Sequence, residues 1–246
     1  MDEVNNLQED DREEMGEESG QKMSLVARIA GIFLDPRKTF LSLESRPDYI
    51  VPLILIVLVV FVCTWAAWPV IETSSMEMMQ EKLTDRGMEQ DQIDQFLENQ
   101  QKFGKISGLA GGPISTVLIM FIVSGILLFA GNMVLGGDST YKKMLCVFSY
   151  ASLVGIIAHI IRTVLIISKG TIEVYTSLAA LFPLDMKETM IFKIAGIFDV
   201  FTIWKIIVIA IGMGVMYRMD YKKPLIVVGL LYVIFAAVAM NFAPGG

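Results

Sequence analysis

Residues 191–217 read IFKIAGIFDVFTIWKIIVIAIGMGVMY, and this stretch decides the fold. A helix that rises about 1.5 Å per residue needs about 20 apolar residues to cross about 30 Å of hydrocarbon, so the stretch predicts a membrane-spanning helix. It also contains Lys193, Asp199 and Lys205. An ionisable side chain inside a span costs about 3 kcal/mol on insertion scales, so such side chains normally face protein or water. We therefore expect other spans to surround this one.

The composition extends the membrane prediction to the rest of the chain. Its 246 residues are 54% hydrophobic and 19% charged, with a mean hydropathy of +0.59, which is outside the usual range of a soluble domain. We predict an all-α fold in which residues 49–243 form a bundle of five transmembrane helices. The expected spans are residues 49–71, 113–135, 144–168, 191–217 and 224–242.

Two segments precede the bundle. Residues 1–22 hold nine of the 26 acidic residues and predict a solvated, disordered leader. Residues 23–48 have helical apolar spacing, and Asp35-Pro36 has the pattern of an N-cap followed by proline at the first helical position. The segment thus predicts two amphipathic helices, which either lie in the membrane interface or pack against the cytoplasmic ends of the spans.

The polar insert at residues 72–106 predicts an extramembrane helical hairpin between the first two spans. Ser74 and Glu77 form a capping-box pattern that predicts the start of a new helix, and Gly87 can end that helix. The insert holds eight acidic and four basic residues, so it is either a docking surface or a solvated elaboration of the loop. A second segment, residues 174–182, is too short to span and predicts a re-entrant or surface helix.

Positive charge predicts the orientation. With five spans, the side that holds the N-terminus carries eleven Lys and Arg residues and the opposite side carries six. The compact turns are the most informative, because long loops count for little in the positive-inside rule. Both turns on the N-terminal side are basic: Lys142 and Lys143 in one, and Arg218, Lys222 and Lys223 in the other. We expect the N-terminus in the cytoplasm and the C-terminus outside.

The third and fourth spans supply a candidate polar cluster of His159, Arg162, Asp199 and Lys205. Arg162 lies about 9 Å and Asp199 about 12 Å from the outer ends of their spans, at matching depth. One hypothesis is that Asp199 pairs with Arg162 directly, through His159 or through water, because an unpaired charge there is costly. The alternative is that Arg162 and Lys193 extend to the outer interface while Asp199 caps a break in the helix. Lys205 lies deeper and needs a separate partner or a wet cavity.

Three motifs occur in order along the chain. Residues 36–40 read PRKTF before the first span, residues 137–142 read GDSTYK and lead to Ser149-Tyr150-Ala151, and residues 199–204 read DVFTIW. In this order around five spans, they resemble the bacterial branch of the Yip family, the Ypt/Rab-interacting polytopic membrane proteins. The residues that carry the resemblance are Pro36, Gly137, Asp138, Tyr141, Tyr150, Asp199, Phe201 and Trp204. The resemblance implies a five-span bundle with a cytosolic N-terminus, here in a bacterial cytoplasmic (inner) membrane.

Two functions remain open. The first is a non-enzymatic integral membrane protein that organises the membrane or binds protein partners or further copies of itself. The alternative is a transporter or an ion- or proton-conducting protein that uses the four residues of the polar cluster. The absence of an internal repeat weakens the second, since many secondary transporters are built from paired halves.

Other classes of protein lack support in the sequence. An enzyme would need a Ser-His pair, facing aspartates or an HExxH motif, and none is present. A single histidine and two cysteines, both in spans, predict no metal site or other cofactor. Without a basic stripe, nucleic acid is not an expected partner, so the expected surroundings are the lipid bilayer and other proteins.

Overall fold

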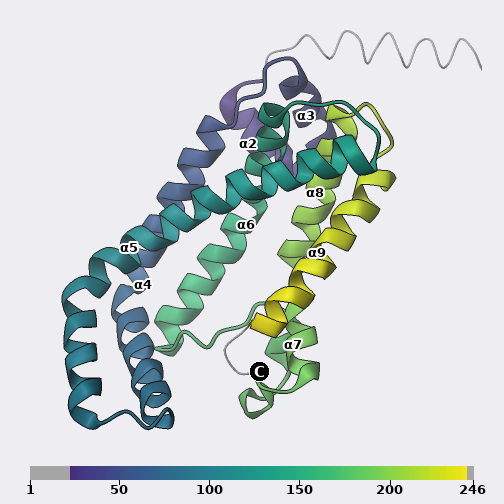
Figure 1. Ribbon diagram of the computed structural model, residues 1–246. Helices are drawn as coiled ribbons and strands as arrows, with labels where there is room; N and C mark the ends of the chain where they lie inside the picture. The colour runs from purple at the N-terminus through teal and green to yellow at the C-terminus, as the bar shows by residue number, and fades with distance from the viewer. Residues whose placement is uncertain (1–22, 243–246) are drawn as a thin grey trace, which may run out of the picture.

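The computed structural model of this chain describes residues 23–242, and within that range it contains helices, turns and loops but no strand (Figure 1). The predicted all-α fold is confirmed. The acidic leader expected at residues 1–22 lies outside the described residues. In chain order, the elements are α2 (Leu25–Leu34), α3 (Pro36–Glu44), α4 (Ile50–Asp85), α5 (Gln90–Phe129), the π-helix η1 (Ala130–Val134), α6 (Tyr141–Lys169), the 3₁₀ turns η2 (Leu178–Leu181) and η3 (Leu184–Met186), α7 (Met190–Ile197), α8 (Val200–Met216) and α9 (Lys222–Phe242).

Four of the described helices are long and apolar enough to cross a membrane: α4, α5 with η1, α6 and α9. Helices α7 and α8 together pass the same test, but they meet at an angle of 45°. The bundle therefore has four spans, or five if α7 and α8 form one bent span. The expectation that residues 191–217 form a continuous helix is wrong, because the chain leaves the helical conformation at Phe198 and Asp199.

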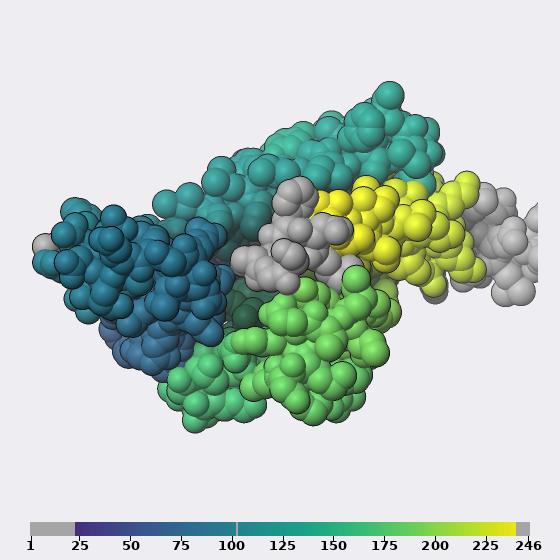
Figure 2. All heavy atoms as spheres, turned by 60° about the horizontal axis from the view of Figure 1, so that its bottom comes forward, coloured from purple at the N-terminus to yellow at the C-terminus, as the bar shows by residue number. Residues whose placement is uncertain are grey.

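The polar insert is not a separate pair of helices. Helix α4 runs through Ser74 without a break, so the helix start predicted there is wrong. The surrounding Met, Glu, Gln and Lys residues favour helix and carry the first span straight into the insert. As predicted, Gly87 ends this helix region, with φ +74°. We call residues 72–106 the hairpin; Figure 2 shows it as a lobe at one side of the lower face, away from α9.

Helix α6 forms the centre of the bundle. Its first half is almost entirely buried, including Leu145, Tyr150 and Val154, and it packs against α4, α5 and α8. Gly212 on α8 faces α6 and α3 at close range, because a Cβ there would come within 3 Å of side-chain atoms of Val147 and Phe40. A glycine at this position lets three helices meet.

The two N-terminal helices pack against the bundle. Asp35 caps α3 by accepting from the Lys38 N–H at 3.0 Å, and Pro36 begins that helix as predicted. Ile32, Phe40 and Leu43 are fully buried against α6 and α8. These contacts match the packing alternative, and a position in the membrane interface stays a prediction.

The bundle has two chemically different ends (Figure 1). Helices α2 and α3 lie at one end with the α5–α6 and α8–α9 turns. We call this the basic end, because Arg37, Lys142, Lys143, Arg218 and Lys222 lie in these segments. The opposite end, which we call the hairpin end, holds the hairpin and α7. The segment at residues 174–182, expected to be a re-entrant or surface helix, forms only the single turn η2.

Candidate functional site

His159 on α6 lies between two cavities inside the bundle. The first has a volume of about 200 Å³ and is also lined by Ser152 and Lys205. The second, of about 130 Å³, is also lined by Arg162 and Thr163. Lys205 and Arg162 of the predicted polar cluster therefore each border a cavity with His159, and Asp199 borders neither cavity.

Lys205 contacts an aromatic ring instead of a carboxylate. Its Nζ atom lies 4.3 Å from the centroid of the Phe148 ring. Among residues 23–242, no acidic side chain lies within ion-pair distance of this amine. A cation over an aromatic face gains about 2 kcal/mol when water is excluded, which offsets part of the cost of burial. The ring and the adjacent cavity together provide the surroundings that the sequence required for Lys205.

Asp199 is the N-cap of α8. Its Oδ2 atom accepts hydrogen bonds from the backbone N–H of Thr202 at 3.1 Å and from the Thr202 hydroxyl at 2.8 Å. On the other side of the break, the Tyr232 hydroxyl of α9 donates to the carbonyl of Ile197 at 2.8 Å. Backbone groups freed at a helix break need such partners inside a membrane. The Asp199 Oδ1 atom is buried and has no partner among the described residues.

The structure does not bring Asp199 and Arg162 together in an ion pair. Among the described residues, the carboxylate bonds to Thr202, and Arg162 is exposed without a bonded partner. The direct pairing hypothesis is therefore wrong, and a link through His159 or water stays a prediction. Lys193 instead pairs with Glu188 at 3.5 Å, at the hairpin end. These contacts match the alternative in which Asp199 caps a break and the cations extend outward.

Sequence reasoning missed Ser152 of the cavity lining and the nearby Ser149, which borders neither cavity. The Oγ atoms of Ser149 and Ser152 and the Nε2 atom of His159 are buried and have no hydrogen-bond partner in the described structure. The three residues lie three and seven positions apart, which places them along one face of α6. That spacing was the available signal, but small hydroxyl residues are also common in spans as packing residues.

Most of the residues that carry the family resemblance hold helices together. The Trp204 ring packs edge-on against Phe33 with centroids 5.6 Å apart. The Tyr141 hydroxyl donates to the Phe121 carbonyl at 2.9 Å, and Tyr150 is fully buried. Phe201 is half-buried, whereas Asp138 is exposed.

Gly137 and Gly131 make room for Tyr217. A Cβ at either glycine would collide with the Tyr217 ring, whose hydroxyl donates to Asn132 Oδ1 at 2.8 Å. Asn132 lies in the π-helix η1, a conformation that widens one helical turn. The second span has no charged residue and a single asparagine, and this asparagine was the only sequence signal for the contact with Tyr217.

Several apolar spanning helices, a packed centre and polar residues held within the bundle define a polytopic α-helical membrane protein. The chain belongs to the Yip1 domain family, whose model matches residues 30–242. It is similar to the membrane protein YknW of Bacillus subtilis (strain 168), with 25% identity over 211 residues that cover 83% of this chain and 87% of that protein. No solved structure matches the chain.

The capping role of Asp199 can be tested by two substitutions. Asp199→Asn keeps an acceptor at the N-cap, so we expect thermal stability in detergent close to that of the wild type. Asp199→Ala removes the acceptor and should lower the free energy of unfolding by about 1 kcal/mol. Thermal unfolding of both variants, with Thr202→Val as the partner control, measures the difference. Equal losses for Asn and Ala would mean that the negative charge, and not the cap, stabilises this position.

Proposed function

We propose that this protein is a non-enzymatic partner-binding protein of a bacterial cytoplasmic membrane, with its basic end in the cytoplasm. The hairpin is the proposed docking surface, on the opposite side of the membrane. The observation that carries the proposal is the pair of acidic stripes on the exposed faces of the hairpin.

The orientation is supported by the charges of the short turns. Lys142 and Lys143 flank the start of α6, and Arg218 and Lys222 flank the α8–α9 turn. Lys and Arg in short loops remain preferentially in the cytoplasm during insertion. The N-terminal helices lie at the same end and add Arg37.

Single-cysteine labelling tests the orientation. Glu89→Cys places a thiol at the hairpin turn and Lys222→Cys places one at the basic end. In spheroplasts, a membrane-impermeant maleimide should label the first variant directly and the second only after permeabilisation. The wild type is the blank, because Cys63 and Cys146 are buried. The reverse labelling pattern would contradict the proposed orientation.

The hairpin extends well beyond what the membrane requires. Helix α4 has 36 residues, a length of about 54 Å, against about 30 Å of hydrocarbon. In the projecting part, Leu83 and Ile93 are buried between the two arms, whereas Met78 and Phe96 are 38% and 41% exposed. A rigid projection with exposed apolar side chains suits contact with another protein.

Each arm of the hairpin carries a stripe of exposed acids. On α4 the stripe is Glu77, Glu81 and Asp85, at intervals of four residues, and on α5 it is Asp91 and Asp94, three residues apart. Like charges at this spacing destabilise a helix by about 0.2–0.5 kcal/mol per pair. Lys187, whose pKa Glu81 helps to raise, offsets part of this repulsion. A partner with a basic face would relieve it, and that is the occupant we propose.

Photo-crosslinking in native membranes tests the docking surface. A photoreactive amino acid in place of Phe96 should give one protein adduct, identified by mass spectrometry. Neutralising the α4 stripe with Glu77→Gln, Glu81→Gln and Asp85→Asn should reduce the adduct about tenfold, since three charge contacts are lost. Thermal stability should not fall, because the same change removes repulsion within the helix.

Two controls make this test specific. Asp138→Asn removes an exposed acid at the basic end and should leave the adduct unchanged. A probe at Phe235, which is 70% exposed on α9, reports random encounters. No adduct at Phe96 above that background, or an adduct that is insensitive to the stripe, would overturn the docking function.

A second candidate, ion or proton conduction, is favoured by the cavity beside Lys205. A lysine and a histidine that border one cavity within a bundle are typical of polar pathways in membranes. Asp199, which the sequence placed on the same path, borders neither cavity and caps α8. Partner binding therefore has the stronger support.

Liposome reconstitution separates the two functions. Under the partner-binding function, we expect proton flux no greater than that of protein-free liposomes. Flux in the wild type that is lost in Lys205→Met and kept in Asp199→Asn would instead establish conduction through the cavity. A pH-sensitive dye inside the liposomes, with an imposed membrane potential, provides the measurement.

A further inference from the structure

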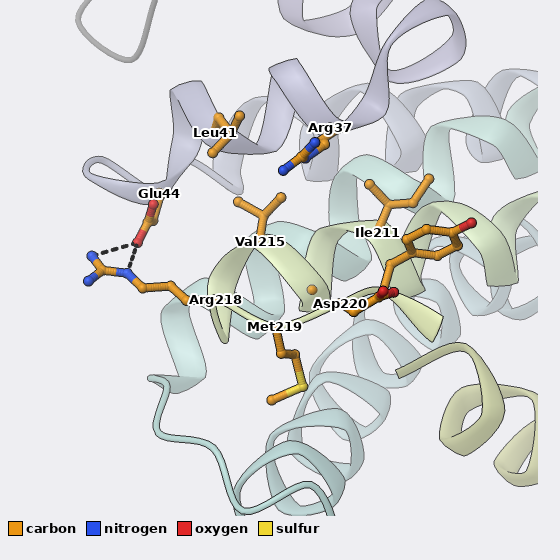
Figure 3. A pocket seen from close by; sticks show the side chains of 10 residues that line it. Arg37, Leu41, Glu44, Ile211, Val215, Arg218, Met219 and Asp220 are labelled. Carbon is orange, nitrogen blue, oxygen red and sulfur yellow. Dashed lines mark hydrogen bonds and ion pairs between the residues drawn. The ribbon is translucent and has the colours of Figure 1, made fainter. Parts of the chain in front are cut away.

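A large cavity lies at the basic end, between α3 and the α8–α9 turn (Figure 3). Its volume is about 720 Å³, within the range of small-molecule sites. Arg37 and Leu41 line it from α3, and Val215 and Asp220 line it from α8 and the turn. The family motif at residues 36–40 supplies Arg37, and neither proposed function uses the cavity.

The turn that forms one wall is held in a fixed shape. Arg218 has φ +52°, a left-handed conformation that costs a non-glycine residue about 1 kcal/mol. Its guanidinium bonds to Glu44 of α3 at 3.0 Å, so the ion pair joins the two walls (Figure 3). Lys143 also approaches Glu44, at 3.9 Å. The cavity is therefore built into the fold, and Glu44 is already neutralised.

Two residues of opposite charge in the cavity lining, Arg37 and Asp220, form no ion pair with another described residue. Arg37 has no bonded partner among residues 23–242, and Figure 3 shows its guanidinium directed from α3 toward α8. The Asp220 carboxylate accepts one hydrogen bond, from the backbone N–H of Lys222 at 2.9 Å, and no described cation pairs with it. The two residues do not pair with each other. A ligand that fits both needs an anionic and a cationic group.

An apolar stripe leads from the cavity along α8. Ile211 lines the cavity, and Ile207 and Ile203 follow at intervals of four residues, so all three share one face of the helix. Ile207 and Ile203 are 38% and 45% exposed. This face runs from the polar end of the bundle into the depth of the membrane, where an acyl chain would lie.

We propose that the cavity binds a zwitterionic phospholipid with a primary ammonium group. The phosphate bonds to Arg37, the ammonium bonds to Asp220, and an acyl chain lies along Ile203, Ile207 and Ile211. A guanidinium is well suited to a phosphate because it offers several donors in a planar fork. An anionic headgroup without the ammonium leaves Asp220 unpaired next to a negative charge. A choline headgroup lacks the N–H donors that a carboxylate accepts from.

Native mass spectrometry of the full chain released from detergent tests this proposal. The protein is mixed with equal amounts of phosphatidylethanolamine, phosphatidylglycerol and phosphatidylcholine of the same chain length. We expect preferential retention of phosphatidylethanolamine. Arg37→Gln should weaken binding of all three lipids about tenfold, the effect of losing about one charge-assisted hydrogen bond. Asp220→Asn should abolish the preference for phosphatidylethanolamine over phosphatidylglycerol.

Two further measurements distinguish this site from a general attraction to surface cations and from a site for soluble phosphates. Lys142→Gln removes an exposed cation at the same end that does not line the cavity, and it should leave lipid retention unchanged. Glycerophosphoethanolamine has the headgroup but no acyl chains, and it should not compete at equal concentration; full competition would assign the site to a soluble phosphate compound and overturn the lipid. The proposal is also overturned if phosphatidylglycerol binds as well as phosphatidylethanolamine, or if Arg37→Gln behaves like Lys142→Gln. Arg37 and Asp220 are outside the Glu44 ion pair, and unchanged thermal unfolding verifies that each variant is folded.

Discussion

Exclusion of lipid from the first half of α6 is the constraint on which the structure depends. Residues 144–154 of this helix are all buried, because α4, α5 and α8 surround them and α2 and α3 close the basic end. Ser149 and Ser152 lie in this enclosed segment, and their Oγ atoms have no hydrogen-bond partner among the described residues. Lys205 benefits from the same enclosure, with the Phe148 ring of α6 beneath its amine.

The basic end is held by contacts between residues far apart in the sequence. Glu44 precedes the first span and Arg218 follows α8, yet the Arg218 Nε and Nη2 atoms both lie 3.0 Å from Glu44 Oε1. Arg28 and Asp48 form a second ion pair at 3.4 Å. Partly exposed pairs of this kind contribute about 0–1 kcal/mol each, so their effect is to fix position more than to stabilise. Burial of the large apolar side chains of α3 supplies the main stabilisation, at about 1.5–3 kcal/mol for each.

Apolar runs, caps and turns could be predicted from the sequence because they depend on local chemistry, as the break at Asp35-Pro36 does. The bend at Asp199 was visible only as an alternative, since a carboxylate in a span is equally consistent with a distant ion pair and with a local cap. The hydrogen bond from the neighbouring Thr202 hydroxyl shows that Asp199 is a local cap.

Partners from other helices could not be predicted: nothing near Lys205 indicates Phe148, which lies 57 positions earlier. The continuity of α4 was missed because a capping-box pattern signals a helix start only where the chain has left the helical conformation.

Polar residues have different surroundings inside and outside the bundle. This difference distinguishes residues that stabilise the fold from residues proposed to bind other molecules. Inside, the Asp199 Oδ2 atom accepts from Thr202, and the Lys205 amine lies over an aromatic face, so each contact lowers the cost of a polar group within the chain itself. On the hairpin, the acids of the α4 stripe are exposed at repelling distances, and at the basic end Arg37 and Asp220 face one cavity without pairing. Under the two proposals, these charges gain further stabilisation from molecules outside the chain: a protein at the hairpin end and a lipid at the basic end.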